Sequence, residues 1–318
     1  MKDLLQLRDT PDSPYGRPPE GRTIPELMSC GAINLDKPQG PSSHQVSAWV
    51  ARMLDIPKAA HGGTLDPRVT GVLPMALGEA VKGLEALLVG GKEYVGVFHL
   101  HQDVPEAKLT RVVADFIGEI YQMPPVRSAV KRELRTRTIH ALRILEVDHR
   151  EVLFQVSCQA GTYVRTLSRD IGEALGVGAH MTDLRRTKAA DFAEVDAHSL
   201  LTLKDALVAW KEDPADLRLR RLLLPMESLL SHLPKVLVKD TAVDALCHGA
   251  KLAAPGITAM SRGIPQGSTV AVLTQKGEGI ALGRTVLPPE EIARAREGIA
   301  VQSYRVLMKP GTYPKLWT

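Results

Sequence analysis

The side chain best placed for chemistry is the carboxylate of Asp66, near the end of the run His-Gly-Gly-Thr-Leu-Asp-Pro at residues 61–67. Gly62 and Gly63 permit backbone angles that other residues avoid, and Pro67 stiffens the chain after the acid. A carboxylate on such a loop can approach a ligand closely and act as a nucleophile or a proton acceptor. Asp-Pro is also common where an aspartate only caps a turn, so the spacing leaves both interpretations open.

His61 opens the same loop and could be a base, a metal ligand or a packing residue. No second histidine or cysteine stands at ligand spacing from it, so we expect no metal site. The chain also lacks a G-x-S-x-G, a Walker A and a dinucleotide-type G-x-G-x-x-G motif. Chemistry that depends on ATP or a nicotinamide cofactor therefore has no support, and we expect no cofactor.

A second candidate is Arg165, which follows Gly-Thr-Tyr at residues 161–163. Apolar residues at helical spacing predict a helix from this point, namely Val164, Leu167, Ile171 and Leu175. Arg165 and Arg169 lie four residues apart and therefore share another face of that helix. An arginine beside a catalytic aspartate would keep it ionised and orient it by a forked hydrogen bond. Spacing alone does not distinguish this from a phosphate contact or a solvated side chain.

The net charge of the 318-residue chain is +4, a mild excess that is unevenly distributed. One basic stretch faces the single acid Glu133 and contains Arg127, Lys131, Arg132, Arg135, Arg137 and Arg143. Two smaller clusters lie at residues 185–188 and 218–221. Such clusters suit a polyphosphate partner such as RNA, because each neutralised phosphate releases counterions. A solvated charged surface is the alternative.

The three cysteines, Cys30, Cys158 and Cys247, are far apart and form no C-x-x-C pair. This pattern predicts neither a disulfide framework nor a cysteine-based zinc site. The first residues do not resemble a signal peptide, and no apolar run reaches the roughly 20 residues that cross a bilayer. We therefore expect a soluble intracellular protein with no membrane contact.

The elements that must position these residues predict a mixed α+β fold. Residues 1–30 contain five prolines and read as an extension laid over another surface. Strands are expected at 32–36, 94–100 and 152–158, and helices over 46–54, 109–116 and 164–175, with a further helical stretch ending at 90–91. Strands and helices alternate irregularly, without repeating βα units. We therefore predict a mixed α+β domain over residues 31–232.

Beyond Pro234 the chain becomes rich in glycine, with strands expected at 270–274 and 280–283. Short strands between glycine turns predict a small β-barrel-like domain over residues 233–318. Domains of this kind bind RNA or dock proteins, and composition leaves both open.

Five blocks in order resemble the TruB family of pseudouridine synthases, and within it the archaeal dyskerin-like enzymes of box H/ACA guide-RNA particles. They are residues 31–46 (GAINLDKPQGPSSHQV), 62–80 (containing GTLDP and TGVLPMALGEA), 92–94 (KEY), 124–138 (PPVRSAVKRELRTRT) and 161–188 (beginning GTYVRTLSRD). Residues 239–285 resemble a PUA domain. The resemblance implies the pseudouridine synthase catalytic fold, which is a mixed, largely antiparallel sheet flanked by helices, followed by a PUA RNA-binding domain.

The resemblance also implies roles for individual residues. Asp66 matches the catalytic aspartate, Arg165 the arginine paired with it, and Tyr94 the tyrosine that stacks on the target base and helps to remove its C5 proton. For substrate binding, His61 matches a residue near the flipped nucleotide, Leu184 lines the pocket, and Lys37 belongs to a motif that supports the catalytic loop.

The basic stretch over residues 124–137 matches a thumb loop that closes over RNA, with Arg127, Lys131, Arg132 and Arg135 as binding residues. Glu133 interrupts this loop, and His140 stands where relatives carry a tyrosine. The first departure predicts a modest loss of thumb affinity.

As a member of this family, the protein would isomerise uridines of rRNA or tRNA to pseudouridine in a pocket of low dielectric constant around a buried Asp66. The implied partners are a box H/ACA guide RNA, a small zinc-ribbon protein, a glycine/arginine-rich-family protein and a kink-turn-binding protein. Two alternatives stay open: a stand-alone tRNA pseudouridine synthase, and a non-catalytic RNA-binding scaffold.

Overall fold

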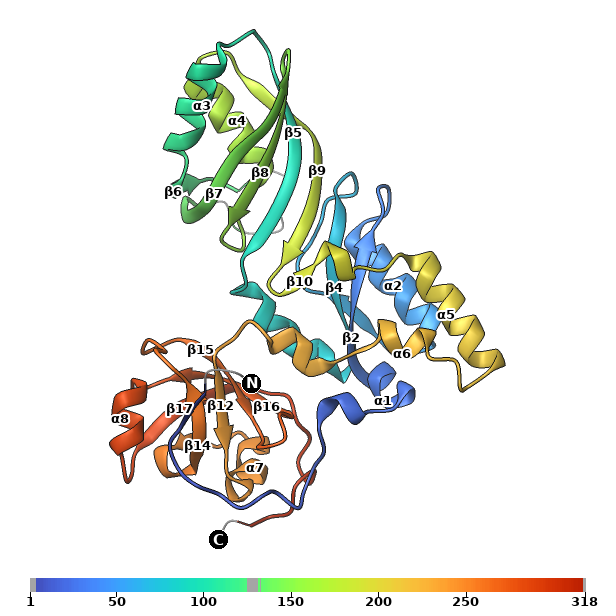
Figure 1. Cartoon of the computed structure of the whole chain (residues 1–318), viewed down its shortest axis with the longest axis vertical. Coiled ribbons are helices and arrows are strands. Elements are labelled where there is room, and N and C mark those ends of the chain that lie inside the picture. Colours follow the sequence, from blue (N-terminus) through green and yellow to red (C-terminus); the bar gives the residue numbers. More distant parts are fainter. Residues whose placement is uncertain (1–3, 125–130, 132, 317–318) are drawn as a thin grey trace.

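The structure is a computed structural model that describes residues 4–124, 131 and 133–316, and it contains two β-sheets (Figure 1). The larger sheet has ten strands in this part of the chain. They are β2 (Cys30–Lys37), β3 (Ala59–His61), β4 (Thr70–Gly78), β5 (Lys92–Leu100), β6 (Gly118–Gln122), β7 (Arg135–Asp148), β8 (Glu151–Cys158), β9 (Ala179–Ala189), β10 (Phe192–Ala193) and β11 (Leu224–Pro225).

The order along this sheet is β11-β2-β4-β9-β5-β8-β7-β6, with β3 on β4 and β10 on β9. All neighbours are antiparallel except β4 and β9, which meet in a short parallel pairing at Gly71 and Arg186. The predicted mixed, largely antiparallel sheet is therefore confirmed. Its two halves join where β4, β9 and β5 lie side by side.

Helices cover the larger sheet in two pairs (Figure 1). Near β2 and β4 lie α2 (Ser43–Leu54) and α5 (Leu200–Glu212), while α3 (Glu106–Asp115) and α4 (Val164–Leu175) lie beside the other half. Ser42 and Gln45 form a capping box that starts α2. Short helices before residue 233 in the described chain are α1 (Ile24–Ser29), α6 (Arg218–Leu222), η1 (Pro19–Gly21), η2 (Glu79–Leu88), η3 (Glu194–Asp196) and η4 (Met226–Leu230).

The predicted helices and strands are present, with one difference of type. The apolar residues Val152, Phe154, Val156 and Cys158 of β8 are buried, as their alternation predicted. The helical stretch before residues 90–91 is the 3-10 helix η2 rather than an α-helix. Its buried residues Ala80, Gly83, Ala86 and Leu87 recur every three or four positions, a spacing that both helix types allow.

Over the residues that the structure describes, the smaller sheet has seven strands in the order β1-β14-β12-β15-β16-β17-β13. Its strands are β1 (Leu4–Gln6), β12 (Lys235–Val238), β13 (Leu252–Ala253), β14 (Ile257–Ser261), β15 (Thr269–Leu273), β16 (Gly279–Thr285) and β17 (Ile299–Val306), accompanied by α7 (Asp240–Cys247), α8 (Pro289–Arg294) and η5 (Ala254–Gly256). Its apolar interior includes Val236, Ile257, Val272 and Ile280, all at 0% exposure.

The N-terminal segment supplies an edge strand to this smaller sheet, because β1 pairs with β14. The segment then passes along the molecule, where Arg22 forms a forked ion pair with Glu227 at 2.7 and 2.8 Å. Arg220 holds it further by donating to the carbonyl of Glu20. The two sheets are also joined by an apolar cluster that includes Val72, Leu229 and Leu282. No helix in the described residues is long and apolar enough to cross a membrane.

Candidate active site

The loop that carries Asp66 connects β3 to β4 and is anchored at both sides of the acid. Leu65 and Val69 are buried in the main core at 3% and 4% exposure. The Ser43 hydroxyl accepts a hydrogen bond from the Leu65 amide and donates one to its carbonyl, both at 2.9 Å. Because Leu65 and Val69 turn inward, the residues between them face outward.

Lys37 lies beneath this loop with a fully buried side chain. Its ammonium donates to the carbonyls of Pro38 at 2.8 Å, Pro67 at 3.2 Å and Val69 at 2.8 Å. Burial and the nearby positive charge of Arg186 both lower the pKa of Lys37. Lys37 therefore ties the end of β2 to the backbone that follows Asp66.

Arg165 and Asp66 form an ion pair in which the guanidinium donates to the carboxylate. Arg165 is the second residue of α4, and Gln122 on β6 orients the start of that helix by two hydrogen bonds with Tyr163, at 2.9 and 3.1 Å. The side chains of Asp66 and Arg165 are 51% and 54% exposed. The expectation of a buried Asp66 is therefore wrong, because its anchored neighbours turn it toward the surface.

Tyr94 and Leu184 lie on the neighbouring strands β5 and β9. In their register Tyr94 stands opposite Arg186 and Gly96 stands opposite Leu184. A Cβ at Gly96 would lie 2.8 Å from the Leu184 side chain, so the absence of one lets Leu184 pack over β5. Burial raises the pKa of Tyr94, while the positive charge of Arg186 acts in the opposite direction.

His61 ends β3 and packs edge-on against His44, with ring centroids 4.9 Å apart. Both of its ring nitrogens are buried, and neither has a hydrogen-bond partner among the described residues. Burial, together with the positive charges of His44 and Arg186, lowers the pKa of His61 to about 4. The imidazole is therefore neutral near pH 7, and it adjoins the loop rather than the carboxylate itself.

The expectation of a phosphate-binding cluster at residues 185–188 is wrong for its first two members. Arg185 is held by Asp36, at 3.0 and 3.1 Å, and by Glu194. Arg186 is 1% exposed and donates to the carbonyls of Val72 and Gly63. Neither guanidinium is a free surface charge. Nothing in the sequence indicated that Arg185 is ion-paired and Arg186 is buried, because the two arginines are adjacent and chemically identical.

Of the predicted thumb residues, Lys131 forms an ion pair with Glu133, and Arg135 begins β7 and donates to the Lys131 carbonyl at 3.3 Å. The Lys131 side chain is 80% exposed. Arg127 and Arg132 lie outside the described residues. Lys131 and Arg135 thus lie together, and among the described residues neither forms a hydrogen bond or an ion pair with Asp66 or Arg165.

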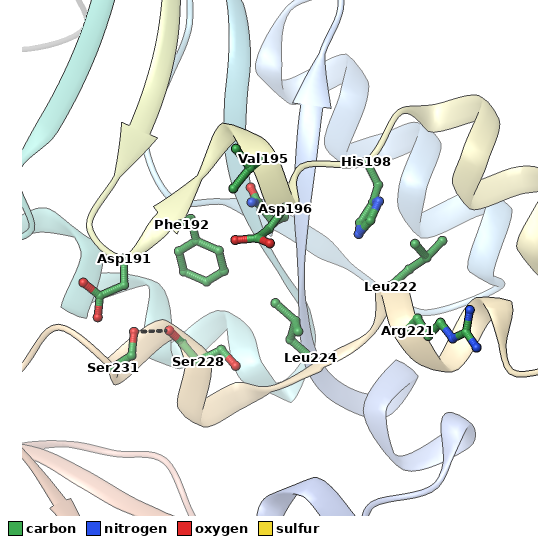
Figure 2. A pocket seen from close by; sticks show the side chains of 11 residues that line it. Asp191, Phe192, Val195, Asp196, His198, Arg221, Leu222, Leu224, Ser228 and Ser231 are labelled. Carbon is green, nitrogen blue, oxygen red and sulfur yellow. Dashed lines mark hydrogen bonds between the residues drawn. The ribbon is translucent and has the colours of Figure 1, made fainter. Parts of the chain in front are cut away.

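A separate pocket of about 410 Å³ lies between η3, β10 and η4 (Figure 2). Its walls combine apolar side chains such as Phe192 and Leu222 with polar ones such as Asp196 and His198. Asp66, Arg165 and Tyr94 do not line it. The candidate active site is therefore the open surface around the catalytic loop rather than this pocket.

Comparison with known proteins agrees with this geometry. The family model of the TruB pseudouridylate synthase N-terminal domain matches residues 51–164, which include Asp66 and Tyr94. The tRNA pseudouridylate synthase B C-terminal domain matches residues 165–231, a PUA domain residues 234–307, and a DKCLD domain residues 5–47. The "Probable tRNA pseudouridine synthase B" of Methanopyrus kandleri is 55% identical over 306 residues, covering 96% of this chain and 90% of the relative.

The chain belongs to the TruB family of pseudouridine synthases. As a TruB-family pseudouridine synthase, it is an enzyme that isomerises uridine in RNA. The protein of the same name from Methanothermobacter thermautotrophicus is 48% identical, with 100% of this chain and 98% of the relative covered.

Two solved structures share the TruB-family fold of this chain over nearly its whole length. A chain of the "Crystal Structure of a Cbf5-Nop10-Gar1 Complex" matches with a TM-score of 0.94 and 48% identity, and the match covers 99% of this chain and 97% of that one. An H/ACA RNP bound to a substrate RNA containing 2'-deoxyuridine matches with a TM-score of 0.91 and 46% identity, at the same coverage. The expected pseudouridine synthase fold with a PUA domain is therefore confirmed.

Proposed function

We propose that this pseudouridine synthase uses Asp66 as its catalytic carboxylate and Arg165 as the side chain that keeps that carboxylate charged and oriented. The ion pair between them, on an anchored loop open to solvent, carries the proposal. Tyr94 and Leu184 contact the target base at this surface, and His61 lies close to the flipped nucleotide. Lys37 acts from below the loop, and Arg127, Lys131, Arg132 and Arg135 contact RNA.

The reaction rearranges bonds within one nucleotide. The N1–C1′ bond of uridine breaks, the base turns, and a C5–C1′ bond forms, while C5 loses a proton and N1 gains one. Substrate and product are isomers, so no redox or energy-supplying cofactor is required. A base leaving the RNA stack loses stacking energy, which the Tyr94 ring can replace. Asp66 acts at the sugar, as a nucleophile or as a proton acceptor.

The tertiary arrangement supports a division of the chain into separate domains. We propose that residues 31–232 form the catalytic domain and residues 233–318 the PUA domain, and that the N-terminal extension of residues 1–30 packs on the latter. The pairing of β1 with β14 favours this division. The position of β1 at one edge of the smaller sheet likewise supports this packing of the extension.

We further propose that the enzyme acts as the catalytic subunit of a box H/ACA guide-RNA particle on rRNA or tRNA. The similarity to Cbf5 solved with Nop10 and Gar1, and to an H/ACA RNP bound to substrate RNA, supports this proposal. Relatives of Nop10 and Gar1, together with a kink-turn-binding protein, are the proposed protein partners. The curated relatives named above are archaeal, so the proposed place of action is the cytoplasm.

Turnover by Asp66 variants tests the catalytic assignment. RNA tritiated at C5 of uridine releases tritium as the proton is lost. We expect Asp66→Asn and Asp66→Ala to lower release by more than about a thousandfold and to leave RNA binding intact. Asp55→Asn is the matched control, since Asp55 has a positive φ that asparagine tolerates. Undiminished release from Asp66→Asn would overturn the assignment.

The name of the curated relatives, tRNA pseudouridine synthase B, favours stand-alone action on tRNA as a second candidate. Turnover of rRNA fragments and of tRNA should be compared with and without an H/ACA guide RNA and the accessory proteins. Guided action predicts that rRNA turnover requires the guide. If the chain alone turns over tRNA as fast as it does with the guide RNA and the accessory proteins, the second candidate is established. A complete lack of turnover in every mixture would favour a non-catalytic scaffold.

A further inference from the structure

Arg186 occupies the centre of the larger sheet, where β9 lies between β4 and β5. It stands opposite Tyr94 on β5 and opposite Gly71 on β4. A Cβ at Gly71, whose φ is +101°, would lie 2.2 Å from the Arg186 carbonyl oxygen, so only glycine lets the strands meet here. The Arg186 side chain is consequently enclosed on all sides, at 1% exposure.

Within the described part of the chain, the buried guanidinium has polar neighbours but no counter-ion. Its Nε donates to the Val72 carbonyl at 2.7 Å, and Nη2 donates to the Gly63 carbonyl at 3.2 Å. No carboxylate among the described residues lies within 4.0 Å of it. Burying a charge without an ionic partner is strongly unfavourable, so its presence in an active site calls for a functional explanation.

The positive charge of Arg186 acts on the groups around the catalytic loop. It contributes to lowering the pKa of Lys37 and of His61, and it opposes the effect of burial on the Tyr94 hydroxyl. Lys92, which donates to the carbonyls of Leu87 and Gly90, also has its pKa lowered, to about 8, by burial and by Arg186. Of these groups, only Tyr94 gains negative charge when it ionises.

We propose that Arg186 is a positioning residue that stabilises Tyr94 as a phenolate during the isomerisation, through the cross-strand contact between β9 and β5. The proposal rests on the proposed function of this site. Through its bond to Gly63 the same guanidinium also fixes the backbone three residues before Asp66. The Arg186 side chain thereby links the loop that carries Asp66 to Tyr94, the residue that transfers the proton.

The proton balance shows where such a phenolate is required. After the N1–C1′ bond breaks, the Tyr94 hydroxyl gives its proton to N1 of the detached base, so that an N1–H bond forms and a phenolate remains. Once the C5–C1′ bond has formed, the phenolate takes the C5 proton, and the double bond of the uracil ring is restored. Tyr94 begins and ends as a phenol, and no co-reactant is needed. A preorganised positive charge beside the phenolate lowers the energy of both steps.

A kinetic isotope effect separates this role from a structural one. RNA carrying 5-deuterouridine should be turned over in single-turnover reactions by the wild type, Arg186→Met and Arg186→Lys, with folding checked by circular dichroism and RNA binding measured alongside. We expect Arg186→Met to lower the rate about 100-fold and to show a primary isotope effect larger than that of the wild type, because C5 deprotonation becomes limiting. Arg186→Lys keeps the charge without the fork, and we expect a loss of about 10-fold with a smaller isotope effect.

The neighbouring Arg185→Met is the matched control, since Arg185 pairs with Asp36 and Glu194 at the surface. It should leave the isotope effect at the wild-type value. If Arg186→Met does not fold, Arg186→Lys carries the test alone. A rate loss in a folded Arg186 variant without an increased isotope effect would overturn the inference and leave the proposed function standing. Full activity of Asp66→Asn in the same assay would overturn the proposed function instead.

Discussion

Arg165 forms an ion pair with Asp66 across 99 residues of sequence, from the first turn of α4 to the tip of the β3–β4 loop. Both side chains are half exposed, so a nucleotide can reach the carboxylate without any rearrangement of the core. The loop itself is held from within by Ser43 and Lys37. The site is thus an accessible charge pair on a rigid base, which is the arrangement that precise positioning of a substrate requires.

The first prediction concerns the orientation of Asp66. Arg165→Met removes the guanidinium, and we expect kcat to fall about 100-fold because the carboxylate is no longer held in the productive geometry. Arg169→Met, one turn later on α4, is the control, since Arg169 pairs with Asp170 and Glu173. Equal kcat values for the two variants would show that the ion pair does not position Asp66.

The second prediction concerns stability in acid. The pKa of His61 is lowered from 6.5 to about 4 in the folded protein, so between these values the unfolded chain binds a proton that the folded chain does not. The free energy of unfolding should therefore fall as the pH drops from about 6.5 to 4, by at most about 3 kcal/mol from this residue.

His61→Phe removes this titration and should flatten the dependence of stability on pH over the same window. Urea unfolding at several pH values measures the slope. His140→Gln replaces an exposed histidine and should leave the slope unchanged. An unaltered slope in His61→Phe would contradict the prediction. It would mean that His61 binds a proton as readily in the folded protein as in the unfolded chain.

The third prediction concerns the support of the catalytic loop. Lys37→Met keeps the length of the side chain but removes the ammonium that donates to three carbonyls, of which, among the described residues, only that of Pro67 retains another donor, the Gly40 amide. We expect the free energy of unfolding to fall by about 2–4 kcal/mol, and kcat to fall with it because the backbone after Asp66 is released. Lys58→Met, at an exposed position, should change neither quantity. A stable and fully active Lys37→Met would exclude this supporting role.

The fourth prediction concerns RNA binding by the basic segment. Lys131→Ala and Arg135→Ala should each weaken RNA binding and reduce the slope of log K against log salt by roughly 0.7–0.9. Glu133→Gln is an internal control of opposite sign, because it frees Lys131 from its ion pair and should strengthen binding. Unchanged salt slopes, measured by filter binding at several salt concentrations, would exclude phosphate contacts by these residues.

Much of the local structure could be predicted from the sequence, because it depends on short-range chemistry. The capping box of Ser42 and Gln45 and the alternation of β8 are written in neighbouring residues. The ordered motifs from residue 31 to 188 likewise pointed to the family and to Asp66. The glycine-rich loop alone left a catalytic and a structural role open, and the resemblance favoured the first.

The contacts between distant residues were decided only by the tertiary structure. Neither the ion pair of Arg165 with Asp66 nor the half-exposed state of that carboxylate follows from spacing, because both depend on how β3, β4 and α4 pack. Arg185 and Arg186 give the clearest case. Successive residues of a strand point to opposite faces, so Arg185 meets two surface carboxylates while Arg186 enters the core beside Tyr94. In the sequence they are one basic pair, and the register of β9 between β4 and β5 separates their roles.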